Sequence, residues 1–223
     1  MEYQQPSAIL FDMDNTLFDL VGAQIASCHD VARYLGRDDG LDLFDYFLRP
    51  DHGFEAHENI LDYLNDRNIS PDGKFRQVCH IYETSKLGNI YPYSGVDKTL
   101  KHLVAAGYRL GVVTDAHSRD AVRRLEKAKL LHYFVGIVSY DMTGKKKPAH
   151  DPFLFALDML KTEPSSTVLV GDSPRRDIEP CHELGIRSVY ARYGDRFADD
   201  RSEVPADFII DNMDELLTIL DNL

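Results

Sequence analysis

Two aspartates separated by one residue, Asp12 and Asp14, directly follow a short apolar run near the start of the chain. A carboxylate can attack a phosphoryl group and form an aspartyl-phosphate, which splits one difficult substitution into two easier steps. A second carboxylate, two residues further on and across a turn, can protonate the leaving alkoxide and later activate water. The pair therefore favours phosphoryl transfer, with Asp12 as the nucleophile and Asp14 as the general acid and base.

Further polar groups follow apolar runs later in the chain. Thr114 and Lys147 offer a hydroxyl and an ammonium group to the oxygens of a transferring phosphoryl group. We expect Asp172 to hold a metal ion, and Asp177 either to ligate that ion through water or to orient Lys147. Several carboxylates in a small volume are costly to bury unless a cation joins them. Oxygen ligands without a His or Cys cluster favour Mg2+ over Zn2+.

These side chains need a scaffold that brings strand ends together. Six short apolar runs predict strands, at residues 7–11, 109–114, 134–139, 167–171, 187–190 and 208–210. Helical stripes lie between most of them, so we predict an α/β fold with a doubly wound, mostly parallel sheet. In such a sheet, ligands bind beyond the carboxyl ends of the strands, where the candidate residues lie.

The region between the first and second of these runs has a different pattern. Its apolar residues recur at helical spacing in four stripes, and we find no convincing strand there. We therefore predict an all-helical domain over residues 18–90, inserted into a core domain formed by residues 1–17 and 91–223.

The charge and cysteine content narrow the class of protein. The chain has 223 residues, 37 acidic and 25 basic, with a formal net charge of −12. That balance argues against a nonspecific nucleic-acid binder and against a protein of anionic membrane surfaces. It leaves room for a small anionic substrate, because a metal ion and a few cations can reverse the field of a pocket. Three widely spaced cysteines make a disulfide framework unexpected.

We expect a cytoplasmic protein, because the chain shows neither a signal-peptide pattern nor an apolar run of transmembrane length. The expected partner is a small phosphorylated metabolite, with no nucleic-acid and no membrane partner. The sequence does not distinguish a monomer from a homodimer.

The motifs resemble those of the haloacid dehalogenase superfamily of phosphohydrolases. The run from Asp12 to Thr16 is similar to motif one (DxDxT), Thr114 to motif two, Lys147-Pro148 to motif three, and residues 171–177 to the GDxxxxD form of motif four. The four occur in the family's order, and the helical insertion resembles its inserted-cap branch. The run that begins at Lys147 is similar to phosphoglycolate-phosphatase-like members.

The resemblance implies a role for each motif residue. Asp12 would be the nucleophile and Asp14 the acid and base, while Mg2+ would be held by Asp12, Asp172 and the backbone carbonyl of Asp14, with Asp177 nearby as a ligand or support. One position departs from the pattern: Asp115 stands where many phosphatase members carry Asn. The sequence does not define where that carboxylate points.

We predict a Mg2+-dependent phosphomonoester hydrolase that acts on phosphoglycolate or a sugar phosphate through an aspartyl-phosphate. A sugar phosphomutase of the same superfamily, a nucleoside monophosphate phosphatase and a phospho-acceptor signalling or binding protein stay open as alternatives. Asp14 disfavours a dehalogenase or a phosphonatase, which would be expected to do without an acid there. A dinucleotide-dependent oxidoreductase lacks GxGxxG after the first strand. A loop with Arg49 and His52 is a candidate for substrate selection.

Overall fold

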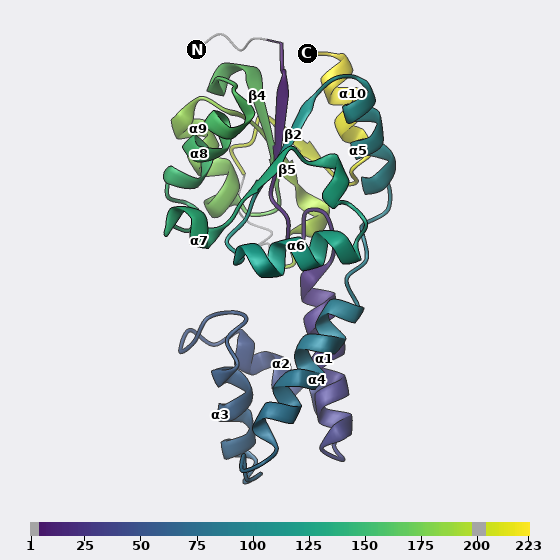
Figure 1. Ribbon diagram of the computed structural model, residues 1–223, viewed down its shortest axis with the longest axis vertical. Helices are drawn as coiled ribbons and strands as arrows, with labels where there is room; N and C mark the ends of the chain where they lie inside the picture. Colours follow the sequence, from purple (N-terminus) through teal and green to yellow (C-terminus); the bar gives the residue numbers. More distant parts are fainter. Residues whose placement is uncertain (1–4, 198–203) are drawn as a thin grey trace. The chain divides into compact units, whose positions relative to one another are not determined.

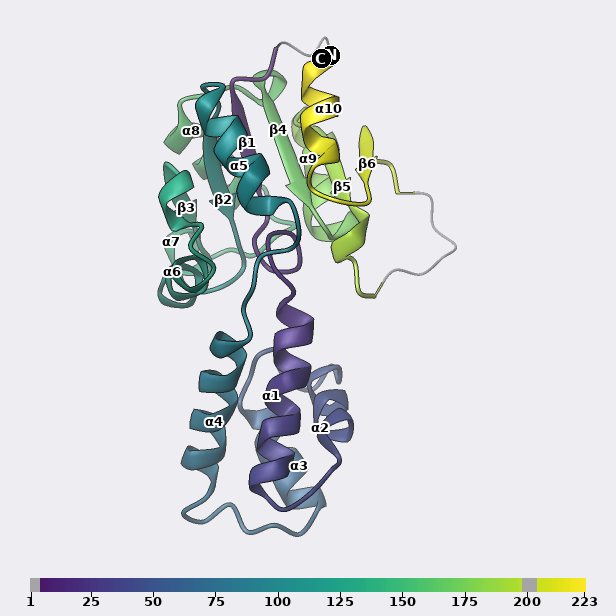
Figure 2. The ribbon, with the colours of Figure 1, turned by 90° about the vertical axis from the view of Figure 1, so that its right-hand side faces the viewer.

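The computed structural model describes residues 5–197 and 204–223. The chain forms two compact units: Met1–Asp19 with Tyr91–Leu223, and the intervening segment Leu20–Ile90. We call the first the core unit and the second the helical unit. Figures 1 and 2 show the elements of each.

The core unit is built on one six-stranded sheet in which every pairing is parallel. The strands follow the order β3-β2-β1-β4-β5-β6. Their bounds are β1 Ala8–Phe11, β2 Arg109–Val113, β3 Gly136–Val138, β4 Thr167–Gly171, β5 Arg187–Ala191 and β6 Phe208–Ile210. β1 and β4 are buried along their whole length, as expected of central strands covered by helices on both faces. The predicted fold class is confirmed.

β3 is shorter at both ends than its apolar run indicates. The prediction of a strand over residues 134–139 is wrong at both ends, because β3 covers only Gly136–Val138. β3 stands at the edge of the sheet and pairs with β2 alone. Val135, just outside it, is 63% exposed. An edge strand has one neighbour instead of two, so its pairing ends sooner than the apolar pattern does.

Helices cover both faces of the sheet. In Figure 1, α8 and α9 lie on one side of the strands, and α5 and α10 lie on the other. α8 contacts β2 and β3, and α5 contacts β2. The helices of the core unit are α5 Val96–Ala105, α6 Ser118–Lys127, α7 Tyr140–Thr143, α8 Asp151–Leu160, α9 Glu179–Leu184 and α10 Glu215–Asp221.

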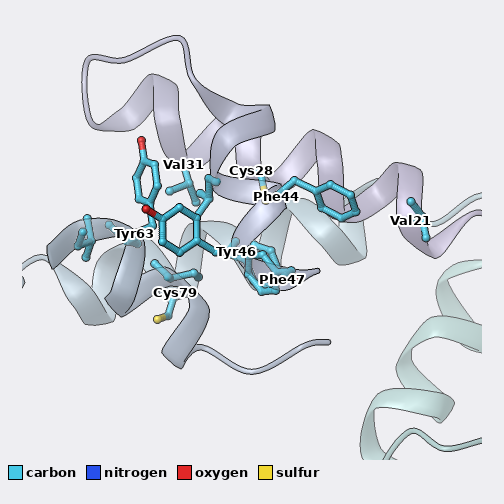
Figure 3. Close-up of a cluster of buried hydrophobic side chains, with 13 residues drawn as sticks. Val21, Cys28, Val31, Phe44, Tyr46, Phe47, Tyr63 and Cys79 are labelled. Carbon is cyan, nitrogen blue, oxygen red and sulfur yellow. The ribbon is translucent and has the colours of Figure 1, made fainter. Parts of the chain in front are cut away.

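The helical unit contains four helices and, over residues 20–90, no strand. They are α1 Leu20–Tyr34, α2 Gly40–Phe47, α3 Glu58–Asp66 and α4 Phe75–Gly88. Thirteen buried side chains form a core of their own, drawn in Figure 3. The rings of Phe47 and Tyr82 are stacked with centroids 5.0 Å apart. The apolar stripes of the sequence therefore face one another inside this unit.

All three cysteines, Cys28, Cys79 and Cys181, are free and buried. Burial raises the pKa of the Cys28 thiol to about 12, which keeps it protonated at neutral pH. Among the residues that the structure describes, no helix combines the length and the apolar character needed to cross a membrane.

Candidate active site

Strand order brings three of the predicted residues to one edge of the sheet. Asp12 follows β1, Thr114 follows β2 and Asp172 follows β4. β1 lies between β2 and β4, so the carboxyl ends of these parallel strands are neighbours. The N–H of Asp12 donates to the carbonyl of Val170 at 2.9 Å, which continues the pairing of β1 with β4 by one residue. All three polar side chains are buried.

A tight turn after β1 returns Thr16 to Asp12. Asn15 adopts a left-handed conformation with a φ of 65°, which Asn tolerates better than most residues. Its N–H donates to the carbonyl of Phe18 at 2.8 Å. The hydroxyl of Thr16 then donates to Asp12 Oδ2 at 2.9 Å and lies 3.5 Å from Asp172 Oδ1. The sequence marks Thr16 only as part of the DxDxT motif, and the structure places its hydroxyl against Asp12.

Lys147 is the centre of a buried ionic cluster. Its Nζ lies 2.5 Å from Asp12 Oδ1 and 2.6 Å from Asp177 Oδ1, and the Lys147 side chain is 1% exposed. Burial would lower the pKa of Lys147, but the two carboxylates outweigh it and raise the pKa above its usual value. Burial likewise opposes the charge on Asp12, while Lys147, Arg176 and the Thr16 hydroxyl lower its pKa. Asp12 is therefore held as a carboxylate at neutral pH.

A compact turn after β4 places Asp177 beside Lys147. Residues Pro174–Ile178 form a short π-helical turn, and the N–H of Ser173 donates to Asp177 Oδ2 at 3.1 Å. A Cβ on Gly171 would lie 2.6 Å from the carboxyl group of Asp177. The close approach of these two residues therefore requires the glycine of the GDxxxxD pattern.

Three carboxylates in this cluster lie close enough together to hold a cation. One oxygen each from Asp12, Asp172 and Asp177 lie within 4.8 Å of one another, and all three residues are buried. Burial, followed by the negative charges of Asp12 and Asp177, raises the pKa of Asp172 well above its usual value. A bound cation would remove that penalty. An all-oxygen donor set fits Mg2+, a hard cation.

Asp115, the residue that departs from the family pattern, has two partners. Its Oδ1 accepts a hydrogen bond from the backbone N–H of Lys147 at 2.8 Å. Its Oδ2 lies 3.6 Å from a guanidinium nitrogen of Arg176. The carboxylate thus fixes the backbone that carries Lys147 and faces a compensating positive charge. Reasoning from the sequence missed Arg176, whose only signal is its place directly before Asp177.

The other two predicted residues make different contacts. The Thr114 hydroxyl accepts a hydrogen bond from the N–H of Ala116 at 3.1 Å. Asp14 forms an ion pair with Arg124 of α6, at 2.8 Å for the shorter of its two distances. Arg124 was also missed from the sequence. Lys147 therefore bridges Asp12 and Asp177, while Asp14 pairs with a different buried cation, Arg124.

The candidates for substrate selection in the helical unit are held by local contacts. The guanidinium of Arg49 lies 3.6 Å from the ring centroid of Tyr46 and 3.8 Å from Asp66. Nε2 of His52 lies 2.9 Å from Asp62 Oδ2. A role of Arg49 or His52 in substrate selection stays a prediction.

Fold and site define an α/β protein whose acidic, lysine-centred cluster lies beyond the carboxyl ends of the central parallel strands. The chain belongs to the haloacid dehalogenase-like hydrolase family, whose family model matches residues 9–191. The inferred resemblance is confirmed, and with it the expectation of a hydrolytic enzyme.

Curated relatives match over nearly the whole chain. A phosphoglycolate phosphatase of Aquifex aeolicus is 30% identical over 96% of this chain and 96% of its own. A glyceraldehyde 3-phosphate phosphatase of Methanocaldococcus jannaschii is 26% identical over 96% of this chain and 97% of its own. Among solved structures, a haloacid dehalogenase-type phosphatase from Thermococcus onnurineus superposes with a TM-score of 0.68 at 25% identity, over 96% and 97% of the two chains.

Proposed function

We propose that the protein is a Mg2+-dependent phosphatase that hydrolyses the monoester of a small phosphorylated metabolite through an aspartyl-phosphate on Asp12. The observation that carries this proposal is the buried bridge from Lys147 to Asp12 and Asp177. Relatives named for phosphoglycolate and glyceraldehyde 3-phosphate support a small organic phosphate as the substrate. We assign to the helical unit, Leu20–Ile90, the role of the family's cap domain.

The residues of this chain divide the reaction between them. Lys147 and Thr16 each hold one oxygen of Asp12, so the nucleophile is ionised and oriented before substrate arrives. The bond from Asp12 to phosphorus forms as the bond to the leaving oxygen breaks, and Asp14 gives that oxygen a proton. Asp14 then takes a proton from the water that hydrolyses the aspartyl-phosphate, which returns Asp12 and releases phosphate.

Charge at the phosphoryl group is met by fixed groups. Lys147 supplies a buried ammonium, and Thr114 offers its hydroxyl from the end of β2. Asp12 and Asp172, with the backbone carbonyl of Asp14 and support from Asp177, would hold Mg2+. When bound, that ion would neutralise charge on the phosphoryl oxygens.

Phosphate release from a panel of phosphorylated metabolites, with and without Mg2+, tests the proposal. The panel includes phosphoglycolate, triose and hexose phosphates and nucleoside monophosphates. We expect metal-dependent release that falls by about 1,000-fold or more in Asp12→Asn, because the amide is a poor nucleophile. Asp45→Asn, an exposed aspartate of α2, is the matched control and should keep full activity.

Two results would overturn the assignment. Release that persists at a similar rate in a folded Asp12→Asn protein would remove Asp12 as the nucleophile. Isomerisation of a hexose phosphate in a parallel assay, faster than phosphate release, would favour a phosphomutase instead. Circular dichroism of each variant establishes that its fold is intact.

A further inference from the structure

The buried face of α6 includes one charged residue, Arg124. Ala121 and Leu125 are buried on this helix, as its spacing requires, and so is Ala128 directly after it. Arg124 shares their face and is 5% exposed, whereas Arg123, the next residue along, is exposed. An arginine is almost never fully buried unless it is paired. The partner of Arg124 therefore explains why it is there.

That partner is the carboxylate proposed as the general acid and base. Nη1 of Arg124 donates to Asp14 Oδ1 at 2.9 Å and to Asp14 Oδ2 at 2.8 Å. The side chains are 6% and 19% exposed, so water screens this pair much less than a pair on the surface. Charge-assisted hydrogen bonds of this length are among the stronger interactions in a protein. The contact fixes the direction of the Asp14 carboxylate on its turn.

We infer that Arg124 is a positioning residue for proton transfer by Asp14, an inference that rests on the phosphatase function proposed above. Proton transfer requires a donor within hydrogen-bond reach of the leaving oxygen, so the orientation of Asp14 affects the rate. A guanidinium has donors but no acceptor and a planar, fixed geometry, so its hydrogen bonds hold both carboxylate oxygens of Asp14 in one direction.

Substrates with different leaving groups distinguish a positioning role of Arg124 from a purely structural one. An alkyl phosphate needs a proton on its leaving oxygen, whereas p-nitrophenolate leaves readily without one. General acid–base catalysis typically contributes about 100- to 10,000-fold to a rate. In Arg124→Met we expect kcat/KM for an alkyl phosphate to fall about 30- to 100-fold and kcat/KM for p-nitrophenyl phosphate to change less than about 3-fold. Arg123→Met is the matched control and should leave both values unchanged.

Two further variants sharpen the test. Arg124→Lys keeps the charge and a flexible stem, and we expect it to restore part of the loss with the alkyl substrate. In an Asp14→Asn background, Arg124→Met should have no further effect on the alkyl phosphate, because the group that it positions is gone. If Arg124→Met does not fold, the ratio of the two substrates in Arg124→Lys carries the same comparison.

Equal losses with both substrates would overturn the inference, as would losses that add to those of Asp14→Asn. All rates are measured on protein whose phosphate release disappears in Asp12→Asn. Failure of the proposed function shows in that Asp12 variant, whereas failure of the positioning role shows in the ratio between substrates or in the additivity with Asp14→Asn.

Discussion

Replacing Lys147 by methionine tests how much the buried ion pairs contribute to the stability of the core unit. Methionine keeps an unbranched stem but removes the charge that faces Asp12 at 2.5 Å and Asp177 at 2.6 Å. The two carboxylates are 5% and 0% exposed and would lose this ammonium. Removal of one partner from a buried pair costs about 3–5 kcal/mol, so we expect the free energy of unfolding to fall by about that amount at pH 7.5.

The loss should depend on pH in a defined direction. Without Lys147, burial and mutual repulsion raise the pKa values of Asp12 and Asp177, so the folded variant binds protons that the unfolded chain does not. Lowering the pH from 7.5 to 5.5 therefore stabilises the folded variant and reduces the difference from wild type. Urea denaturation in EDTA measures the free energy at each pH.

Matched variants make the result interpretable. Lys145→Met removes an exposed charge from the same loop and should change stability by less than about 0.5 kcal/mol. The double change Lys147→Met with Asp177→Asn should recover at least half of the loss, since one uncompensated carboxylate is gone. A loss below about 1 kcal/mol at pH 7.5, or the same loss at both pH values, would refute the reasoning.

Two further predictions concern one residue near the site and one in the helical unit. A Cβ on Gly194 would lie 1.9 Å from the carbonyl oxygen of Asn15, so Gly194→Ala should destabilise the core unit by more than about 2 kcal/mol and lower activity. Gly88→Ala, with nothing within 4 Å, should be neutral or stabilising, and equal urea midpoints for the two variants would contradict the clash. A hydrogen bond from Arg37 lowers the pKa of Asp39 from 3.8 to about 2 despite partial burial. That stabilisation, about 1 kcal/mol after screening, is present above pH 3.8 and lost as the pH falls toward 2; acid titration of Asp39→Asn should lack this step.

The scaffold was predictable from the sequence because its central strands are covered on both faces. β1 and β4 are buried throughout, so they read as unbroken apolar runs that end at Asp12 and Asp172. Each helix of the helical unit buries one face, so its apolar residues recur at a spacing of three to four residues. The apolar run at residues 134–139 led to a strand prediction that was too long, because an apolar residue can flank an edge strand without belonging to it.

The two arginines of the site, Arg124 and Arg176, were harder to predict from the sequence. Arg124 follows Ala121 by three residues and precedes Leu125, so its inward position was available from helical spacing. However, α6 carries several charged residues, and nothing in the sequence indicates that Arg124 is the one that contacts Asp14. The pairing of Arg176 with Asp115 joins two motifs that are far apart in the chain, and local pattern carries no information about such contacts.

The charged side chains of the cluster leave it with a net negative charge. Asp12, Asp172 and Asp177 lie within reach of Lys147 and Arg176, and Asp115 adds a fourth carboxylate that Arg176 faces. Arg176 and Asp115 cancel in charge, so the carboxylate that departs from the family pattern leaves the balance of the site unaltered. The remaining three carboxylates and one ammonium carry two negative charges in excess, which adds to burial, the larger cause, in raising the pKa of Asp172. For the proposed phosphatase, a substrate phosphate adds further negative charge, which the proposed Mg2+ would offset.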